Sequence, residues 1–125
     1  MQDIKLASGR FDDLINWVRT NLPGDIRVET MAEKAGMSPP NFARIFRSET
    51  GTTPARFVEK LRLEAARQLV ETTGLPLRKI ATDTGFCDAE RMRLAFMPAY
   101  GQPPMVLRRQ RKTAGEIQTL SKNND

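Results

Sequence analysis

The chain has 125 residues and a net charge of +5 at neutral pH, from 20 lysines and arginines against 15 aspartates and glutamates. It has no histidine and a single cysteine, Cys87, which excludes a Ser-His-Asp triad, a Cys-His pair, an internal disulfide and a zinc cluster of cysteines and histidines. We therefore expect no enzyme, no metal and no cofactor, and the basic charge favours a polyanionic partner.

The sequence also lacks the patterns of a membrane or secreted protein. No stretch approaches the ~20 apolar residues that a helix needs to cross a bilayer. The first residues, MQDIK, do not show the basic-then-apolar order of a secretion signal. A cytoplasmic protein is expected, associated with the nucleoid if its partner is DNA.

Apolar residues of the first half recur at helical spacing and predict helices over 11–22, 28–35 and 39 to about 50. Ser38 and Pro39 mark the start of the third, because serine caps helices and proline is tolerated at the first helical position. The residues expected on the buried sides of these helices are Phe11, Leu14, Ile15, Val18, Leu22, Val28, Met31, Ala32, Ala35, Phe42, Ile45 and Phe46.

A long helix is expected over 54–73, since Thr53 repeats the capping signal and Gly74 follows its last turn. Its apolar stripe is Phe57, Val58, Leu61, Ala65, Leu69 and Val70. Two shorter helices follow, one from Leu77 to Thr84 and one capped by Asp88. Pro98 falls inside the latter and is expected to end or kink it. Nothing alternates with period two, so the predicted fold class is all-α, with about seven helices.

The two halves carry the same pattern. Ala32 and Gly36 recur as Ala81 and Gly85, and the spaced set Phe46, Gly51 and Pro54 recurs as Phe96, Gly101 and Pro104. Two helices joined by a tight glycine turn are typical of a helix-turn-helix unit. An ordinary helical hairpin is the alternative, and the duplication in a basic chain favours the helix-turn-helix.

This pattern predicts five segments. They are an N-terminal extension over 1–10, a first helix-turn-helix subdomain over 11–53, a linker helix over 54–73, a second helix-turn-helix subdomain over 74–108, and a polar tail over 109–125 that is expected to be disordered. A linker helix of this length spans roughly 30 Å, close to the ~34 Å between successive major grooves on one side of DNA. It is therefore long enough to hold both subdomains in adjacent grooves.

The run AEKAGMSPPNFARIFRSETGTTPARFV, with the later runs RLEAARQLV and IATDTGFCDAERMRLAF, resembles the AraC/XylS family over about residues 10–108. The resemblance implies the DNA-binding domain of a bacterial transcription regulator, with seven helices in two helix-turn-helix subdomains. The AERMRLAF run is also similar to members with a glutamine-amidotransferase-like N-terminal domain. This similarity implies that the effector and dimerisation domain lies outside this chain.

In the first subdomain, the resemblance places Pro40, Ala43 and Arg44 at base edges in the major groove. Arg44 is able to hold the O6 and N7 of a guanine, and the alternative is a solvated or phosphate-bound arginine. Pro40 and Ala43 offer only apolar contacts, such as one with a thymine methyl group. Asn41 is expected to bond either a base or a phosphate.

In the second subdomain, Glu90 and Arg91 are the candidates for base contacts. Leu94 stands at the position that matches Arg44, so an equivalent arginine contact is absent. Glu90 either accepts a hydrogen bond from a cytosine amino group or pairs with Arg91 or Arg93. The second subdomain could therefore act mainly as a clamp on the DNA backbone.

Further residues are expected to contact phosphate, or else to remain solvated surface groups. They are Ser38, Arg47, Arg56, Arg78, Lys79, Arg93, Arg108 and Arg109. The predicted function is sequence-specific binding of double-stranded DNA and regulation of transcription. The alternative is a helical protein-interaction module that contacts the transcription machinery, such as RNA polymerase. RNA binding is less favoured, because the few aromatic residues fall at core positions instead of exposed stacking positions.

Overall fold

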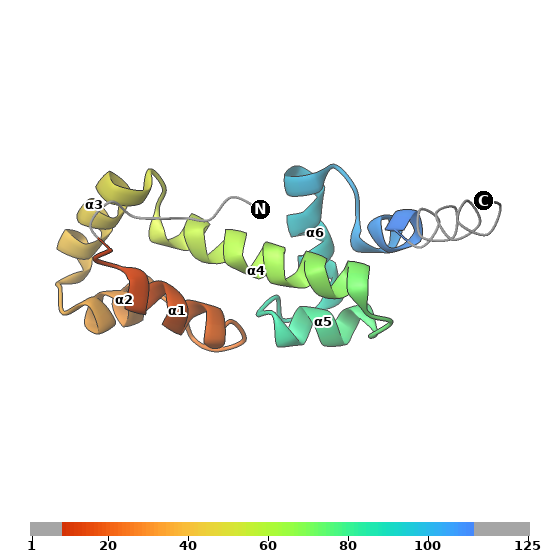
Figure 1. Cartoon of the computed structure of the whole chain (residues 1–125), viewed down its shortest axis with the longest axis horizontal. Coiled ribbons are helices and arrows are strands. Elements are labelled where there is room, and N and C mark those ends of the chain that lie inside the picture. The colour runs from red at the N-terminus through yellow and green to blue at the C-terminus, as the bar shows by residue number, and fades with distance from the viewer. Residues whose placement is uncertain (1–8, 112–125) are drawn as a thin grey trace, which may run out of the picture. The chain divides into compact units, whose positions relative to one another are not determined.

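The computed structural model describes residues 9–111, which form helices and turns without a strand in that range. The helices are α1 (Asp12–Thr20), α2 (Val28–Ala35), α3 (Pro39–Thr50), α4 (Pro54–Thr72), α5 (Leu77–Asp83) and α6 (Ala89–Tyr100) (Figure 1). A further helical stretch covers 104–111. The all-α prediction with about seven helices is confirmed.

The predicted N-terminal extension and the predicted polar tail lie largely outside the described residues. Residues 1–8 and 112–125 are not described, and these hold most of the expected extension and of the expected tail. The tail was placed too early by three residues, because 109–111 continue the last helix. Leu107 is only 6% exposed and packs the last helix into the core of the second unit. The polar sequence that follows Leu107 does not indicate this packing.

The helix starts follow two of the three capping signals. The Asp88 side chain accepts a hydrogen bond from the Arg91 N–H at 2.8 Å and caps α6, and Thr53 accepts one from the Arg56 N–H at 3.3 Å before α4. Ser38 has the extended backbone of an N-cap but makes no capping hydrogen bond. Two prolines follow Ser38, and a proline at the second helical position has no N–H to donate to it.

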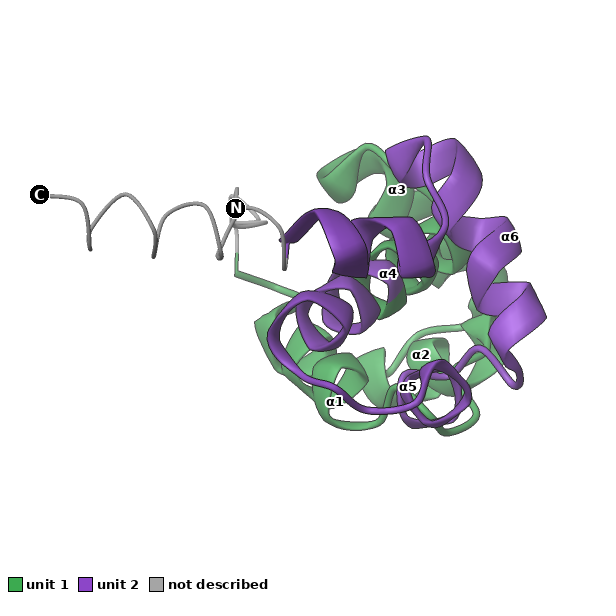
Figure 2. Ribbon diagram, turned by 90° about the vertical axis from the view of Figure 1, so that its right-hand side faces the viewer, with its two compact units in different colours: residues 1–62 green, residues 63–125 purple. Residues whose placement is uncertain are grey.

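The chain divides into two compact units, residues 1–62 and residues 63–125, shown in green and purple in Figure 2. The division falls inside α4, between Arg62 and Leu63, whereas the sequence pattern places it at the two ends of that helix. Each unit therefore contains one helix-turn-helix together with about half of α4.

Four phenylalanines form the centre of the first unit. Phe46 lies 5.2 Å from Phe11, 5.4 Å from Phe42 and 5.2 Å from Phe57, measured between ring centroids. All four are at most 1% exposed, and edge-to-face or tilted pairs of this kind contribute about 0.5–1.5 kcal/mol each beyond their burial. The cluster joins the segment before α1 to α3 and to the first half of α4.

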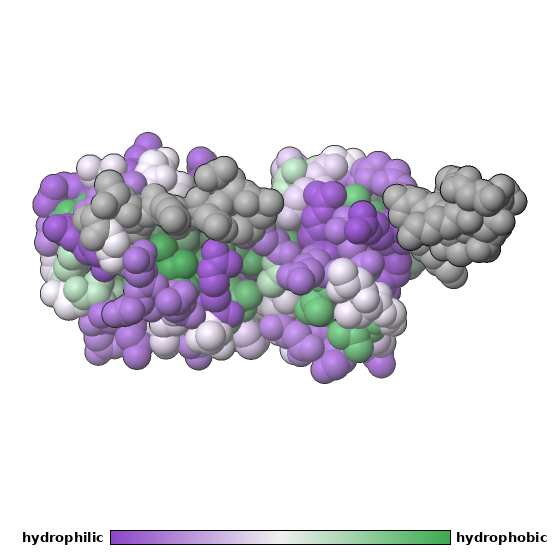
Figure 3. All heavy atoms as spheres, in the orientation of Figure 1, coloured by the Kyte–Doolittle hydropathy of each residue, from purple (hydrophilic) through white to green (hydrophobic). Residues whose placement is uncertain are grey.

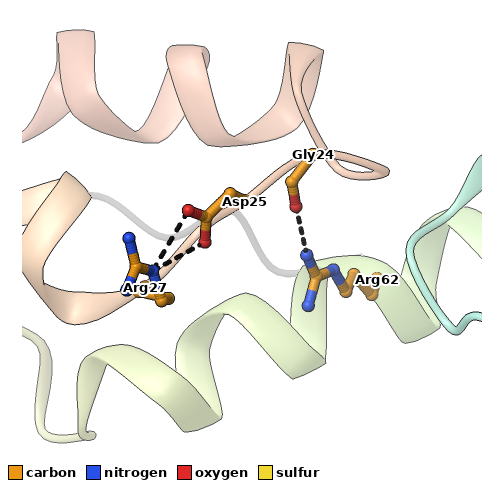
Figure 4. A network of polar contacts seen from close by, with 4 residues as sticks. All are labelled: Gly24, Asp25, Arg27 and Arg62. Carbon is orange, nitrogen blue, oxygen red and sulfur yellow. Dashed lines mark hydrogen bonds and ion pairs between the residues drawn. The ribbon is translucent and has the colours of Figure 1, made fainter.

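Arg62 fastens the loop between α1 and α2 to α4. Its Nε donates to the Leu22 carbonyl at 3.0 Å and its Nη2 donates to the Gly24 carbonyl at 3.2 Å. Figure 4 shows the second of these bonds beside the separate, exposed pair of Arg27 and Asp25.

The second unit has its own core, made by Leu63, Ala66, Val70, Ile80, Ala81, Phe86, Met92, Phe96 and Leu107. Two arginines close over it. Arg67 lies 4.5 Å from the centroid of the Tyr100 ring and pairs with Glu71 at 3.1 Å. The Arg108 Nε donates to the Val70 carbonyl at 3.1 Å.

The apolar stripe expected along α4 is only partly right. Phe57, Val58, Leu61 and Val70 are buried, but Ala65 and Leu69 are half-buried, and the buried places are taken by Leu63 and Ala66. The stripe assumed one continuous face, whereas the first half of α4 packs in the core of one unit and the second half in the core of the other. Ile45 of α3, also expected inside, is half-buried.

Pro98 does not end α6, so the first of the two effects expected of it is wrong. The helix continues to Tyr100, and Gly101 closes it in the left-handed conformation, with its N–H donating to the Met97 carbonyl at 2.8 Å. Only two helical residues follow Pro98, so the missing N–H costs a single bond near the end of the helix. Tyr100 packs edge-to-face on Phe96, with ring centroids 5.1 Å apart, and this contact holds the last turn.

Candidate nucleic-acid interface

In the first unit, α2 and α3 pack together as a helix-turn-helix. Ala32 is fully buried on α2, as its small side chain at a helix crossing predicts. Gly36 then ends α2 at φ +71°, and the Met37 N–H donates back to the Ala32 carbonyl at 3.0 Å. This is the closure that a left-handed residue after a helix permits. A Cβ on Gly36 would meet nothing within 4 Å, so the glycine is required for its backbone conformation.

The second unit repeats this turn between α5 and α6, with one difference. Ala81 is fully buried and the Phe86 N–H donates to the Ala81 carbonyl at 2.8 Å, matching the bond between Met37 and Ala32. Cys87, the residue added in this copy, adopts φ +65° and is exposed. Among the described residues it is the one non-glycine with positive φ. The insertion is visible in the sequence, but its backbone conformation is not.

The outward face of α3 is polar and basic. Pro40, Asn41, Arg44 and Arg47 are exposed and Ala43 is half-buried. The structure brings together two of the predicted contact residues, since the Arg44 Nη2 donates to the Asn41 Oδ1 at 2.6 Å. Both ends of this bond are open to solvent, so the guanidinium has N–H groups to offer a ligand in front of the helix.

The first turns of α6 are occupied by ion pairs. Arg93 donates from Nε and Nη2 to the two carboxylate oxygens of Glu90, at 2.9 Å and 2.7 Å. This hydrogen bonding lowers the pKa of the Glu90 carboxyl below its usual value and raises the pKa of Arg93. Arg91 lies 3.8 Å from Asp88. Of the alternatives open for Glu90, the structure shows the pairing with Arg93.

Apolar side chains are exposed on and near α6. Leu94 is 54% exposed, Met97 39% and Met105 51%, and within residues 9–111 these are the large hydrophobic residues most open to solvent. Leu94 was noticed in the sequence as the counterpart of Arg44, but Met97 and Met105 were not. The signal for Met97 was available, because the offset of 50 between the two copies places it at the position of Arg47, which is expected at the surface.

The candidate phosphate-binding residues differ in how available they are. Ser38, Arg47, Arg56, Arg78 and Arg109 are exposed. Lys79 is exposed but pairs with Asp83 at 3.2 Å, and Arg93 pairs with Glu90. Arg108 is half-buried and donates a hydrogen bond to the Val70 carbonyl, so part of its guanidinium is already engaged within the second unit.

Hydrophilic side chains dominate the coloured surface in Figure 3, with apolar residues in small patches. Over the described range, every helix is too short or too polar to cross a membrane. The same range brings no three metal-ligating side chains together.

Comparison with known proteins places this arrangement in a family. The family model described as "Helix-turn-helix domain" matches residues 31–110. An HTH-type transcriptional regulator of Mycobacterium tuberculosis is 42% identical over 81 residues, which cover 65% of this chain and 31% of that protein. The transcriptional activator RhaS of Mannheimia succiniciproducens is 34% identical over 76% of this chain and 35% of its own length. The chain thus spans about a third of the curated relatives it matches.

Solved structures give the same result. The DNA-binding domain of AdpA, a global transcriptional factor in complex with a target DNA, superposes with a TM-score of 0.79 at 28% identity, over 84% of this chain and 95% of that one. An AraC-type transcriptional regulator from Chromobacterium violaceum shares the fold, with a TM-score of 0.77 at 23% identity over 84% and 94% of the two chains. The resemblance found in the sequence is therefore confirmed, and the chain belongs to the AraC/XylS family of helix-turn-helix domains.

Proposed function

We propose that this protein binds double-stranded DNA sequence-specifically and regulates transcription, with α3 and α6 as the helices that enter the major groove. The observation that carries the proposal is the face of α3. It presents Arg44 and Arg47 to solvent while Phe42 and Phe46 anchor its other side in the phenylalanine core. A rigid helix with outward arginines is suited to base edges and to phosphates. The AdpA domain, 28% identical, was solved with its target DNA.

Within this function, Arg44 and Asn41 are the base-reading pair of α3, and Pro40 and Ala43 supply apolar contacts beside them. Arg91 remains a candidate for a base contact from α6, and Glu90 has that role only where Arg93 releases it. The proposed phosphate contacts are Ser38, Arg47, Arg56, Arg78, Lys79, Arg93, Arg108 and Arg109. A protein with this role works in the cytoplasm, on the nucleoid.

The length of α4, 19 residues, supports binding of both units to one duplex. At 1.5 Å per residue it measures about 30 Å, close to one repeat of the major groove. We expect that inserting half a turn of DNA between the two half-sites reduces the affinity sharply. Inserting a full turn of DNA should restore part of the affinity. Equal affinity for all spacings would mean that one unit binds alone.

The test of the proposed function is binding of the chain to genomic and to random duplexes, followed by fluorescence anisotropy over a range of salt concentrations. Each phosphate that the protein neutralises should add about −0.9 to the slope of log K against log salt. Steep salt dependence together with preference for selected sequences supports the proposal. A flat response, or equal affinity for all duplexes at all salt concentrations, refutes it.

The alternative is a module that binds a protein of the transcription machinery, such as RNA polymerase. The observation in its favour is the exposure of Leu94, Met97 and Met105 in the second unit. In this alternative, the three side chains contribute to an apolar surface that contacts the partner. Salt-independent binding to RNA polymerase, in the absence of DNA binding, would support it.

A further inference from the structure

The two helices proposed to enter the groove present different chemistry at matching positions. The repeat places Leu94 at the position of Arg44, Met97 at that of Arg47 and Pro98 at that of Ser48. All six residues are exposed, so the difference lies in what each helix shows to solvent. Where α3 offers hydrogen-bond donors, α6 offers apolar groups.

The polar groups of α6 are already engaged with one another. Both carboxylate oxygens of Glu90 accept from Arg93, at 2.9 Å and 2.7 Å. Asp88 accepts from the Arg91 N–H and lies 3.8 Å from the Arg91 side chain. These two acidic and two basic residues have no net charge between them, in contrast to the arginines of α3. A bidentate contact to a base edge through Nε and Nη2 of Arg93 therefore requires breaking its pair with Glu90.

We infer that α6 recognises thymine methyl groups through Leu94 and Met97, while α3 recognises bases through the hydrogen bonds of Arg44. This inference rests on the proposed function. Thymine is the one base whose major-groove edge carries a methyl group, and an apolar side chain reads that group by excluding water. Leu94 supplies a branched contact, and the flexible thioether of Met97 adapts to the groove wall.

DNA is the occupant that the second unit favours for this face. The turn before α6 is closed by the same backbone bond as the turn before α3, which makes α6 the equivalent element of a second helix-turn-helix. Arg78 and Arg109 are exposed cations of the same unit, and arginines of this kind are able to hold phosphates.

The experiment begins with duplexes selected for binding to the full chain. The base pair at which Arg44→Ala relaxes the preference locates the α3 half-site, and the half-site about one turn of the duplex away is assigned to α6. Each thymine of the α6 half-site is then replaced by deoxyuridine, which removes the methyl group and nothing else. Loss of one methyl contact should weaken binding about fourfold, from the ~0.8 kcal/mol of one buried methylene-sized group.

The same substitutions are repeated with Leu94→Ala and with Met97→Ala. The sensitivity to deoxyuridine should disappear at the thymine that each side chain contacts, as in a double-mutant cycle. Met105→Ala is the matched control, because Met105 is as exposed as Leu94 but lies outside α6. It should keep the full deoxyuridine effect. Since all three side chains are exposed, thermal melting should show that the variants remain folded.

The outcomes separate this inference from the proposed function. Specific, salt-dependent binding that ignores deoxyuridine throughout the α6 half-site overturns the inference and leaves the function intact. Absence of specific binding to any duplex overturns both. If Leu94→Ala and Met97→Ala bind DNA normally but weaken transcription with purified RNA polymerase, the face docks a protein and the inference is wrong.

Discussion

Arg44 donates its Nη2 to the Asn41 Oδ1 at 2.6 Å, one turn apart on the exposed face of α3. The bond restrains a guanidinium that would otherwise move freely on a long, flexible stem. Asn41 and Arg44, which the sequence indicates as separate contact residues, are thus joined by a hydrogen bond. Asn41 positions the side chain whose remaining N–H groups face outward.

Replacement of Arg44 by alanine should cost about 1–3 kcal/mol in binding to the selected site and relax the preference at one base pair, because a bidentate contact to guanine is lost. Anisotropy with the selected site and with single-base variants measures both effects. Arg47→Ala should weaken binding to all sequences alike. Arg19→Ala, at an exposed position on α1, is the control. Equal loss on selected and random DNA would show that Arg44 contacts only phosphate.

Replacement of Arg62 by methionine should lower the free energy of unfolding by about 1.5–3 kcal/mol, because two hydrogen bonds from a charged donor to the Leu22 and Gly24 carbonyls are lost. Methionine keeps the apolar stem, so the change reports on the bonds instead of the packing. Urea denaturation provides the measurement.

The neighbouring pair in Figure 4 supplies the control. Arg27→Met removes an ion pair with Asp25 in which both side chains are more than 60% exposed. Exposed pairs of this kind contribute about 0–1 kcal/mol. If the two substitutions lower the free energy of unfolding equally, the bonds of Arg62 to the loop contribute no more than an exposed ion pair.

Replacement of Gly36 by alanine should destabilise the first unit by about 1 kcal/mol, because an L-residue at φ +71° is strained. Gly74→Ala is the matched control, since neither position has an atom within 4 Å of the added Cβ and Gly74 does not have positive φ. We expect Gly74→Ala to be neutral or slightly stabilising. Equal effects in thermal melting would exclude backbone conformation as the cause.

Ionisation of Tyr100 should destabilise the second unit at high pH. Burial raises the pKa of Tyr100 above its ordinary value, with Glu64 and Glu71 adding to the rise and Arg67 opposing it. A raised pKa means that folding favours the neutral phenol. The stability that the neutral phenol contributes is fully present below the pKa of tyrosine in the unfolded chain, about 10. It is lost as the pH rises through the pKa of Tyr100 in the folded protein.

Tyr100 is the only tyrosine of the chain, so the absorbance of tyrosinate follows this one group. Its titration should lie above that of the urea-unfolded protein. Lysines titrate in the same range, so Tyr100→Phe serves as the reference, and the difference in stability between the two proteins should shrink as pH rises above 10. A folded titration at or below the unfolded one would contradict the raised pKa.

The order and type of the helices were predictable because local signals determine them. Proline and glycine mark their ends, and apolar residues at helical spacing mark their buried sides. Leu63 and Ala66 were missed, since a single periodic stripe cannot show that α4 contributes to two cores. The helix end at Tyr100 was also missed, because only two helical residues follow Pro98 and its missing N–H costs a single bond near the helix end.

The exposure of the candidate contact residues was predictable from the sequence, the bonds that they make were not, and their contacts with DNA stay predictions. The sequence identified Arg44, Asn41 and Glu90, yet which side chains pair depends on rotamers that no pattern shows. Arg62 bonds to carbonyls about 40 positions away in the chain. Such contacts exist only after folding, so the helical pattern of the sequence does not show them.

The sharing of α4 between two compact units has a consequence for folding. If one unit opened, its half of the helix would lose its core, and each half is shorter than the ~12–15 residues at which an isolated helix becomes marginally stable in water. Fraying that starts in one unit thus removes helical hydrogen bonds at the edge of the other. We therefore expect a destabilising substitution in one core to lower the melting temperature of both units.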